Sequence, residues 1–269
     1  MVAFPHCKIN LGLHVIAKRE DGYHNIETCF YPVPWTDVLE IIPSREFSFT
    51  HSGLIIPGKA EDNLCIKAYQ LIKGRFPISP VKIHLHKVLP AGAGLGGGSS
   101  DAAFTLRILN SVFDLQIDHP QLQEFALQLG SDCAFFIDDK PRLGKGRGEL
   151  LTDLPVSLKG FYIVLVKPEI HVSTADAFAG VVPETSKQSL SEILTRPVKD
   201  WKDHLQNDFE VSVFKKYPVI QSIKSELYTQ GALYASMSGS GSSVFGLFQD
   251  KTELSSYFKG MQFWSDYLN

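Results

Sequence analysis

The chain has 269 residues, a formal net charge of −3 and a hydrophobic content of 44%, values in the normal range for a globular protein. The small negative charge excludes a global attraction to nucleic acids or to anionic membranes. No apolar run approaches the roughly twenty residues that a membrane helix needs. Lys8 and Asn10 interrupt the start of the chain, which therefore does not resemble a secretory signal. We expect a small-molecule substrate, no nucleic-acid or membrane partner, and leave the oligomeric state open.

The four cysteines stand singly along the chain, at positions 7, 29, 65 and 133, and form no CxxC pair. This spacing indicates neither a zinc site nor a disulfide framework. Because isolated thiols are typical of reducing compartments, we expect a cytoplasmic enzyme with reduced cysteines.

The first predicted element is a β-strand at residues 7–13, where apolar side chains at odd positions alternate with Lys8, Asn10 and Gly12. The functional interpretation places Lys8 against a phosphate or a reacting hydroxyl. A lysine and an asparagine on a solvent-facing side of the strand would explain the same pattern.

An Asp21–Gly22 turn follows, and it is succeeded by Tyr23 and His24. An aromatic ring and an imidazole at this place can stack on a base and hydrogen-bond to a base or a sugar. The simpler alternative is a hairpin turn with an amphipathic tyrosine.

The most informative segment is a glycine-rich run at residues 89–101, between a predicted half-buried strand at 81–86 and a helical pattern. Glycine permits positive φ angles and close approach of a ligand, and a helix start offers unpaired N–H groups with partial positive charge. We therefore predict an anion cradle, most often used for phosphate. Ser99, Ser100 and Asp101 are all favourable residue types for the helix N-cap.

Three other interpretations of this glycine-rich run have to be distinguished from a phosphate cradle. Gly92, Gly94 and Gly97 have the spacing of a dinucleotide fingerprint, which requires a βαβ unit. The Walker A pattern also nearly fits, but Gly98 replaces its lysine, so positive charge would have to come from elsewhere. The third alternative is a flexible loop without function.

A second candidate for chemistry is Asp132. It follows an amphipathic helix predicted at residues 122–129 and closed by Gly130, and it precedes a very apolar run. A partly desolvated carboxylate there suits a base or a positioning group for an attacking hydroxyl. A solvent-facing loop aspartate would give the same sequence.

The last candidate segment is a second glycine–serine run at residues 236–243, which leads into an apolar strand at 244–248. It needs no function as a turn between strands. It could also close over phosphates from the side opposite the cradle.

The length fits one large domain or two of ordinary size. A glycine-rich and charged stretch at residues 144–160 precedes an apolar strand, and strands and helices lack steady βα alternation. We therefore expect an α+β fold class rather than a doubly wound sheet, with domains at residues 1–150 and 151–269. The polar stretch at 183–203 is predicted to be loop and short helix.

The order of the motifs is more specific than any one of them. From about residue 6 to residue 248 the chain resembles the GHMP small-molecule kinases. The resemblance rests on Lys8-x-Asn10-Leu11, Asp21-Gly22-Tyr23-His24, the run from Pro90 to Ser100, Leu129-Gly-Ser-Asp132, Gly-Arg-Gly-Glu149 and Met237-Ser-Gly-Ser-Gly241.

This resemblance implies two α+β domains with the active site in the cleft between them. It implies an ATP-dependent kinase that uses Mg²⁺ and phosphorylates a cytidine-diphosphate-linked polyol in non-mevalonate isoprenoid biosynthesis. The alternatives are a related kinase for mevalonate, homoserine or a sugar, a dinucleotide-dependent oxidoreductase, and a nucleotide-binding regulator without catalysis. The Mg²⁺ ligands stay unassigned.

The resemblance also implies roles for individual residues. Lys8 would take the catalytic lysine position, which supplies the charge of the missing Walker lysine, and Asp132 the catalytic carboxylate position. Asn63 and Lys87 would lie near the nucleotide base. The ATP phosphates would be held by Pro90, Ala91, Gly92, Ala93, Gly94, Leu95, Gly96, Gly97, Gly98, Ser99 and Ser100, and the cytidine diphosphate by Asn10, Tyr23, His24 and Phe178.

Two departures from the family pattern stand out. Asp101 follows the two serines where many relatives have asparagine, which would add negative charge near ATP although it suits the first turn of a helix. The late run ends in Ser242 and Ser243, where relatives often carry larger side chains or cysteine.

Overall fold

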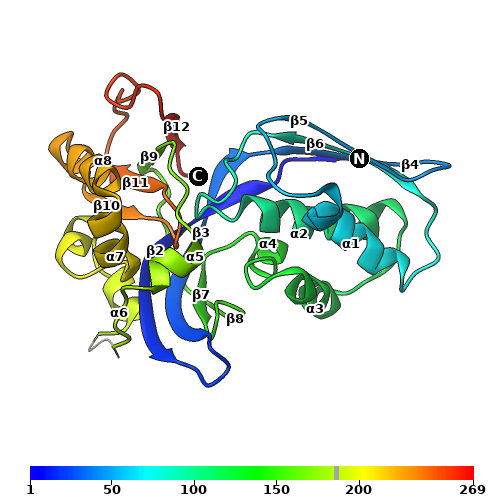
Figure 1. The fold of residues 1–269 in the computed structure, drawn as a ribbon, viewed down its shortest axis with the longest axis horizontal. Coiled ribbons are helices and arrows are strands. Elements are labelled where there is room, and N and C mark those ends of the chain that lie inside the picture. Colours follow the sequence, from blue (N-terminus) through cyan, green and yellow to red (C-terminus); the bar gives the residue numbers. More distant parts are fainter. Residues whose placement is uncertain (185–187) are drawn as a thin grey trace. The chain divides into compact units, whose positions relative to one another are not determined.

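The computed structural model describes residues 1–184 and 188–269. Its helices and its three four-stranded sheets confirm the expected α+β class (Figure 1). The chain folds into two compact units, each made of several segments. The compact units are defined by packing and interleave along the chain. The predicted domains at 1–150 and 151–269 therefore stay a prediction. The first unit comprises Met1–Cys7, Trp35–Ala91 and Gly96–Lys140, and the second comprises Lys8–Pro34, Gly92–Leu95 and Pro141–Asn269.

The first unit contains a sheet of strand order β1-β4-β6-β5, in which β5 and β6 are parallel and the other pairs antiparallel. Figure 1 shows α1 and α2 against one face of this sheet. The strands are β1 (Val2–Ala3), β4 (Val38–Pro43), β5 (Ser48–Gly53) and β6 (Val81–Lys87). The helices are η1 (Ala60–Asp62), α1 (Leu64–Lys73), α2 (Gly97–Val112), α3 (His119–Leu129) and α4 (Phe135–Asp138).

The core of the first unit follows the sequence periodicity. Strand β6 alternates as predicted, with Val81, Ile83 and Leu85 buried under the helices. Along α2 the small Ala102 and Ala103 are completely buried, which allows the first turn of the helix to pack closely. Because α2 leads into α3 and not into a parallel strand, the glycine run does not lie in the βαβ unit that a dinucleotide fingerprint requires.

Helix α3 confirms the predicted amphipathic helix. Leu122, Phe125 and Ala126 are buried, and the Asp118 side chain caps the helix by accepting a hydrogen bond from Gln121 N–H at 2.9 Å. The helix ends at Leu129, and Gly130 follows with a φ of 168°, which is extended rather than left-handed.

The second unit contains two antiparallel sheets, with strand orders β2-β3-β7-β8 and β10-β11-β9-β12. The predicted strands at 161–166 and 244–248 are confirmed as β9 and β11, neighbours whose residues are almost all buried. The strands are β2 (His6–Lys18), β3 (His24–Thr36), β7 (Arg142–Lys145), β8 (Leu150–Asp153), β9 (Tyr162–Lys167), β10 (Tyr234–Met237), β11 (Val244–Phe248) and β12 (Gln262–Tyr267).

Helices of the second unit cover the sheet that contains β9. Ile220, Ile223 and Leu227 on one helix join Val164 and Val166 of β9 in the same core. Part of the polar stretch at 183–203 forms two short helices, while residues 185–187 lie outside the described residues. The helices are α5 (Thr174–Phe178), α6 (Leu190–Leu194), η2 (Val198–Asp203), α7 (Phe209–Lys216) and α8 (Pro218–Thr229).

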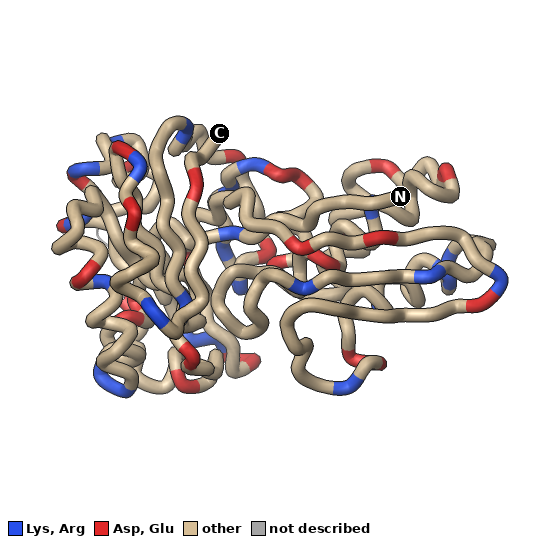
Figure 2. Tube along the Cα trace, turned by 90° about the horizontal axis from the view of Figure 1, so that it is seen from above, with Lys and Arg blue, Asp and Glu red and all other residues tan. Residues whose placement is uncertain are grey.

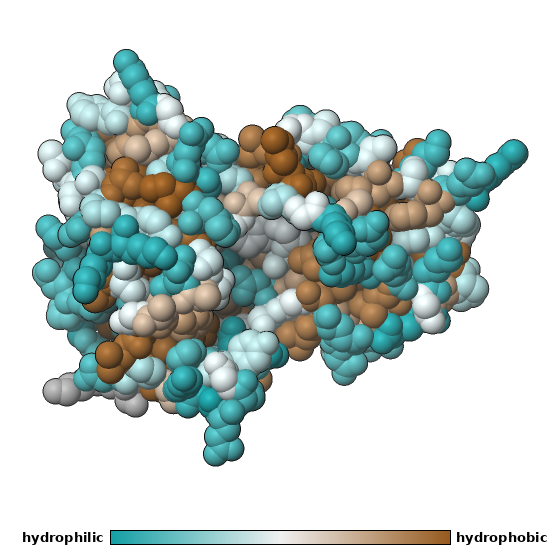
Figure 3. All heavy atoms as spheres, in the orientation of Figure 1, coloured by the Kyte–Doolittle hydropathy of each residue, from teal (hydrophilic) through white to brown (hydrophobic). Residues whose placement is uncertain are grey.

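Charged residues of both signs are interspersed along the trace of each unit, in keeping with the net charge of −3 (Figure 2). Hydrophilic atoms cover much of the face seen in Figure 3, with small apolar areas between them. Among the helices that the structure describes, none is long and apolar enough to span a bilayer. The four cysteines are buried and form no disulfide with one another.

Candidate active site

The glycine run turns the chain into α2 by backbone conformation alone. We call residues 90–98 the first glycine loop. Gly92, Gly94 and Gly96 have positive φ angles of 63°, 80° and 70°, a conformation that glycine adopts without strain. Gly96 is the N-cap of α2, and the helix begins at Gly97.

The predicted N-cap role of Ser99, Ser100 and Asp101 is therefore wrong. These residues lie inside the helix, Asp101 just beyond its first turn, because a left-handed glycine supplies the bend that a side-chain cap would otherwise support. The first intrahelical bond runs from Ser100 N–H to Gly96 O at 2.9 Å. The N–H groups of Gly97, Gly98 and Ser99 are then the helix-start donors that carry partial positive charge.

A buried ion triad anchors this first turn in the first unit. Lys87 Nζ donates to Asp101 Oδ2 at 2.7 Å and to Asp37 Oδ2 at 2.5 Å. Asp37 Oδ1 in turn accepts the N–H groups of Val88 and Leu89 at 2.6 and 2.7 Å. A Cβ at Gly97 would lie 3.1 Å from Lys87 Nζ, so the lysine packs directly beneath the start of the helix.

The triad explains the departure at Asp101. Burial raises the pKa of the Asp101 carboxyl to about 7, Lys87 opposes this effect, and Asp37 adds to it. Burial alone would lower the pKa of Lys87, but the two carboxylates outweigh burial and raise it. The Asp101 charge is thus compensated by Lys87, and the Lys87 ammonium, predicted near the nucleotide base, is held by carboxylates.

The structure places Asn63 at the N-cap of α1, where its Oδ1 accepts the Cys65 N–H at 2.9 Å. It belongs to the first unit, like Lys87. Its contact with a nucleotide base stays a prediction.

Asp132 lies in a turn between α3 and α4 and is half-buried. Its neighbour Cys133 is buried and hydrogen-bonds with the Ser99 side chain, and burial raises the pKa of the Cys133 thiol to about 12. The first unit thus brings the Asp132 turn against the first turn of α2.

In the second unit, Lys8 and Asn10 are buried rather than solvent-facing, with exposures of 3% and 2%. Lys8 Nζ donates to Asn10 Oδ1 at 2.6 Å and lies 5.1 Å from the centre of the Phe30 ring. Asn10 Nδ2 donates to Thr28 Oγ1 at 2.9 Å, and Thr28 donates to Gly12 O. This chain of hydrogen bonds fixes the orientation of the Lys8 ammonium.

The second glycine loop, residues 236–243, packs on the part of the first loop that belongs to the same unit. Ser238 Oγ donates to Gly94 O at 2.9 Å, and Ser243 N–H to Ala93 O at 3.2 Å. Lys8 N–H donates to Leu95 O at 2.9 Å. A Cβ at Gly239 would lie 3.5 Å from Lys8 Nζ. The second unit therefore brings both glycine segments together with Lys8 and Asn10.

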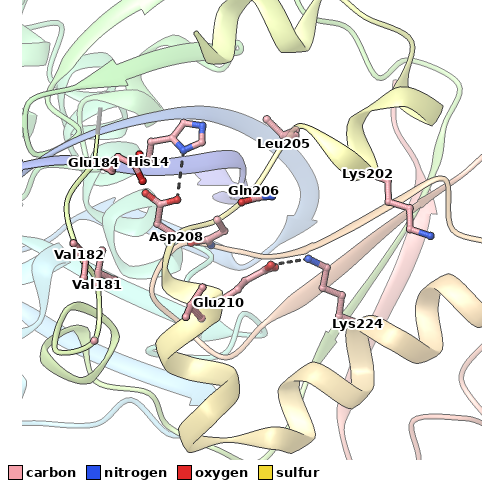
Figure 4. Close-up of a pocket in the computed structure, with 13 residues that line it drawn as sticks. His14, Val181, Val182, Glu184, Lys202, Leu205, Gln206, Asp208, Glu210 and Lys224 are labelled. Carbon is pink, nitrogen blue, oxygen red and sulfur yellow. Dashed lines mark hydrogen bonds and ion pairs between the residues drawn. The ribbon is translucent and has the colours of Figure 1, made fainter. Parts of the chain in front are cut away.

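Residues that the sequence analysis missed support the second glycine loop from behind. Asn207 Nδ2 donates to Met237 O and Gly239 O at 2.8 and 2.9 Å. Glu210 accepts the Met237 N–H at 2.8 Å and pairs with Lys224 at 2.6 Å. Asn207, Glu210 and Lys224 line a pocket of about 740 Å³ (Figure 4). The only local signal was an Asn-Asp pair before a helical pattern.

The predicted base-binding residues also lie in the second unit, and two of their rings stack on each other. The Phe178 ring stacks on His24, with centroids 4.5 Å apart and planes 20° apart. Tyr23 is 56% exposed, and the guanidinium carbon of Arg147, from the Gly-Arg-Gly-Glu149 motif, lies 5.0 Å from its ring centre. Asp21 accepts the Tyr23 N–H at 3.1 Å, which closes the predicted turn.

Comparison with known proteins gives consistent matches. The family models "GHMP kinases N terminal domain" and "GHMP kinases C terminal" match residues 63–139 and 189–260. A 4-diphosphocytidyl-2-C-methyl-D-erythritol kinase of Cytophaga hutchinsonii is 54% identical over 254 residues, which cover 94% of each chain. The protein of the same name from Bacteroides fragilis is 52% identical over 258 residues, again 94% of each chain.

Solved structures agree. A crystal structure of 4-(cytidine 5'-diphospho)-2C-methyl-D-erythritol kinase matches with a TM-score of 0.85 and 29% identity, over 98% of each chain. The mevalonate kinase of Methanococcus jannaschii has a TM-score of 0.72 at 13% identity, over 100% of this chain and 98% of that one, and shares the fold.

The contact between the two glycine loops predicts a strong effect of Gly94→Ala. A Cβ there would lie 2.0 Å from Ser238 O, whereas Gly160, with a similar φ of 87°, has open space around it. Gly160→Ala should lower the free energy of unfolding by about 1–2 kcal/mol through backbone strain. Gly94→Ala should lose about 1–3 kcal/mol more through overlap. Urea denaturation of both variants tests this, and equal losses would contradict the contact.

Removal of Lys87 should leave two carboxylates buried and unpaired. We expect Lys87→Met to lower the free energy of unfolding by about 3–5 kcal/mol at pH 8, whereas Lys82→Met, on the exposed side of β6, should have little effect. Because the Asp101 pKa is raised in the folded state, the folded chain binds more protons between about pH 4 and 7, and stability falls as pH rises there.

The loss caused by Lys87→Met should therefore shrink at pH 5, where protonation relieves the repulsion between the two carboxylates. Urea denaturation at the two pH values measures this. A loss of equal size at both would show that the charge of the lysine does not matter.

Proposed function

The chain belongs to the GHMP kinase family, and we propose that it phosphorylates a hydroxyl of 4-diphosphocytidyl-2-C-methyl-D-erythritol with ATP, giving the 2-phosphate and ADP. In this role it acts in non-mevalonate isoprenoid biosynthesis, in the cytoplasm. The observation that carries the proposal is the buried ammonium of Lys8, held by Asn10 beside the second glycine loop. Relatives of that name at 54% and 52% identity support the choice of substrate.

Phosphoryl transfer depends chiefly on positioning and on charge stabilisation, because its transition state is loose. We assign the N–H groups of Gly97, Gly98 and Ser99 to the ATP phosphates, together with the rest of Pro90–Ser100. The Lys8 ammonium faces the γ-phosphate and supplies the charge that Gly98 does not.

Asp132 acts on the acceptor. The bond between the γ-phosphorus and the ADP oxygen breaks as a bond to the acceptor hydroxyl forms, and the hydroxyl proton passes to Asp132 late in the transfer. Orientation of the hydroxyl contributes more than basicity, because phosphoryl transfer depends chiefly on positioning.

Ser100 fits the requirement for a Mg²⁺ ligand. Its Oγ is buried and has no hydrogen-bond partner in the described part of the chain, and Mg²⁺ prefers oxygen ligands and binds through few protein groups plus substrate phosphates. When bound, Mg²⁺ neutralises charge on the β- and γ-phosphates. Among the described residues, no cluster of three or more His, Cys, Asp or Glu side chains could hold a metal.

The cytidine diphosphate is assigned to Asn10, Tyr23, His24 and Phe178. Tyr23 offers an exposed ring on which a pyrimidine can stack, worth about 1–3 kcal/mol. Arg147 beside this ring supports an anionic substrate. Asn63 and Lys87 remain proposed to lie near the nucleotide base, where the buried Lys87 acts by holding Asp101 and the start of α2.

The proposed substrate is tested by ATP consumption with a panel of acceptors. Turnover should depend on the cytidylated alcohol, and mevalonate, homoserine and simple sugars should give at least about 10²-fold lower kcat/KM. A higher kcat/KM with one of the other acceptors would replace the proposed substrate by a different one of the same family.

Asp132→Asn keeps the shape of the side chain and removes its ability to accept the proton. We expect kcat to fall at least about 10²-fold, with the Kd of ATP unchanged. Asp62→Asn, an exposed aspartate of the same unit, serves as the control. Turnover like that of the unmodified chain would remove Asp132 from the reaction.

Tyr23→Ala should raise the KM of the cytidylated substrate about 5- to 150-fold, the equivalent of about 1–3 kcal/mol, and change the KM of ATP little. Tyr23→Phe keeps the ring and should stay close to the unmodified chain. Steady-state kinetics with each substrate varied measures both constants. Parallel increases in the two KM values would argue against a stacked base at Tyr23.

A further inference from the structure

The segment of residues 168–173 connects β9 to α5. Within the second unit it touches the second glycine loop and the part of the first glycine loop that belongs to this unit. Ser242 Oγ of the second loop donates to Ile170 O at 2.8 Å. At the next residue, the His171 ring lies against Gly92 of the first loop: a Cβ at Gly92 would be 2.9 Å from Nδ1 and 3.0 Å from Cε1. The missing side chain at Gly92 therefore admits the imidazole.

The position of His171 is defined by its neighbours, while the residue itself stays exposed. Val172 on one side is buried in the core of the unit, and Ser173 caps α5 by accepting the Asp176 N–H at 3.0 Å. An imidazole in either protonation state keeps at least one N–H donor. His171 is thus a hydrogen-bond donor that is fixed in position and exposed to solvent, and it lies against the backbone of the first glycine loop.

We propose that His171 binds a phosphate oxygen of the nucleotide held by the first glycine loop. The inference rests on the proposed function, in which this loop holds ATP. In this role His171 supplies a side-chain hydrogen-bond donor next to the loop, in addition to the backbone N–H groups and to Lys8. Binding by His171 concerns the donor nucleotide and not the cytidylated acceptor.

The experiment separates hydrogen bonding from packing. His171→Phe keeps a flat ring against Gly92 without a donor, and His171→Ala removes both. His171→Gln keeps an N–H donor on a side chain of similar reach. Isothermal calorimetry with the ATP analogue AMPPNP and Mg²⁺ measures the Kd for each. His51→Ala, an exposed histidine of the first unit, is the control.

The Phe and Ala variants should both bind AMPPNP about 10-fold more weakly, the effect of one lost hydrogen bond to a charged group, and the Gln variant should regain most of the affinity. The KM of ATP should rise in the Phe and Ala variants and much less in the Gln variant, while kcat and the KM of the acceptor stay unchanged. A Phe variant with normal affinity would overturn the proposal, because packing would then suffice.

Failure of the proposed function gives a different result. If the unmodified chain binds AMPPNP but does not phosphorylate the cytidylated acceptor, the substrate is wrong, and the Kd series still decides the role of His171. If the unmodified chain does not bind AMPPNP, both proposals fall.

Discussion

Backbone contact between the two glycine loops is the constraint on which the site in the second unit depends. A Cβ at Gly94 would lie 2.0 Å from Ser238 O, and one at Gly241 2.2 Å from Ala93 C and Gly94 N. Only glycine at both places allows this approach. Leu95 O then accepts the Lys8 N–H, so strand β2 is attached to the same pair of loops. The place of the Lys8 side chain therefore follows from main-chain geometry, which few surface substitutions would disturb.

The first unit fixes the start of α2 by a different force. There the chain buries one ammonium and two carboxylates, and burial of this kind is tolerated when the opposite charges are paired. Lys87 joins Asp37 to Asp101, and Asp37 uses its second oxygen for two main-chain N–H groups. The start of α2, with the N–H groups of Gly97 and Gly98, is thus fixed from one side by these buried charges.

The periodicity of apolar residues made much of the fold predictable. The pairing of residues far apart in the sequence could not be predicted. The strands at 161–166 and 244–248 and the helix at 122–129 follow from local alternation, which burial in the core enforces. No local pattern could reveal that Lys87 pairs with Asp37, fifty positions earlier. The same limit applies to the stacking of His24 on Phe178, because ring partners are chosen by tertiary packing. The N-cap of α2 was predicted too late in the chain, at residues 99–101. N-cap preferences describe side chains, whereas Gly96 starts the helix through its positive φ angle.

The two buried lysines show why residue type alone does not assign a role. Lys8 and Lys87 are both almost fully buried. Two carboxylates compensate the charge of Lys87, so its contribution is to hold the fold. The contacts that orient Lys8 in the second unit include an amide oxygen and an aromatic ring, which carry no formal charge. A phosphoryl-transfer site needs positive charge that is oriented before the reaction begins. These contacts, visible only after folding, support the proposal that Lys8 faces the γ-phosphate.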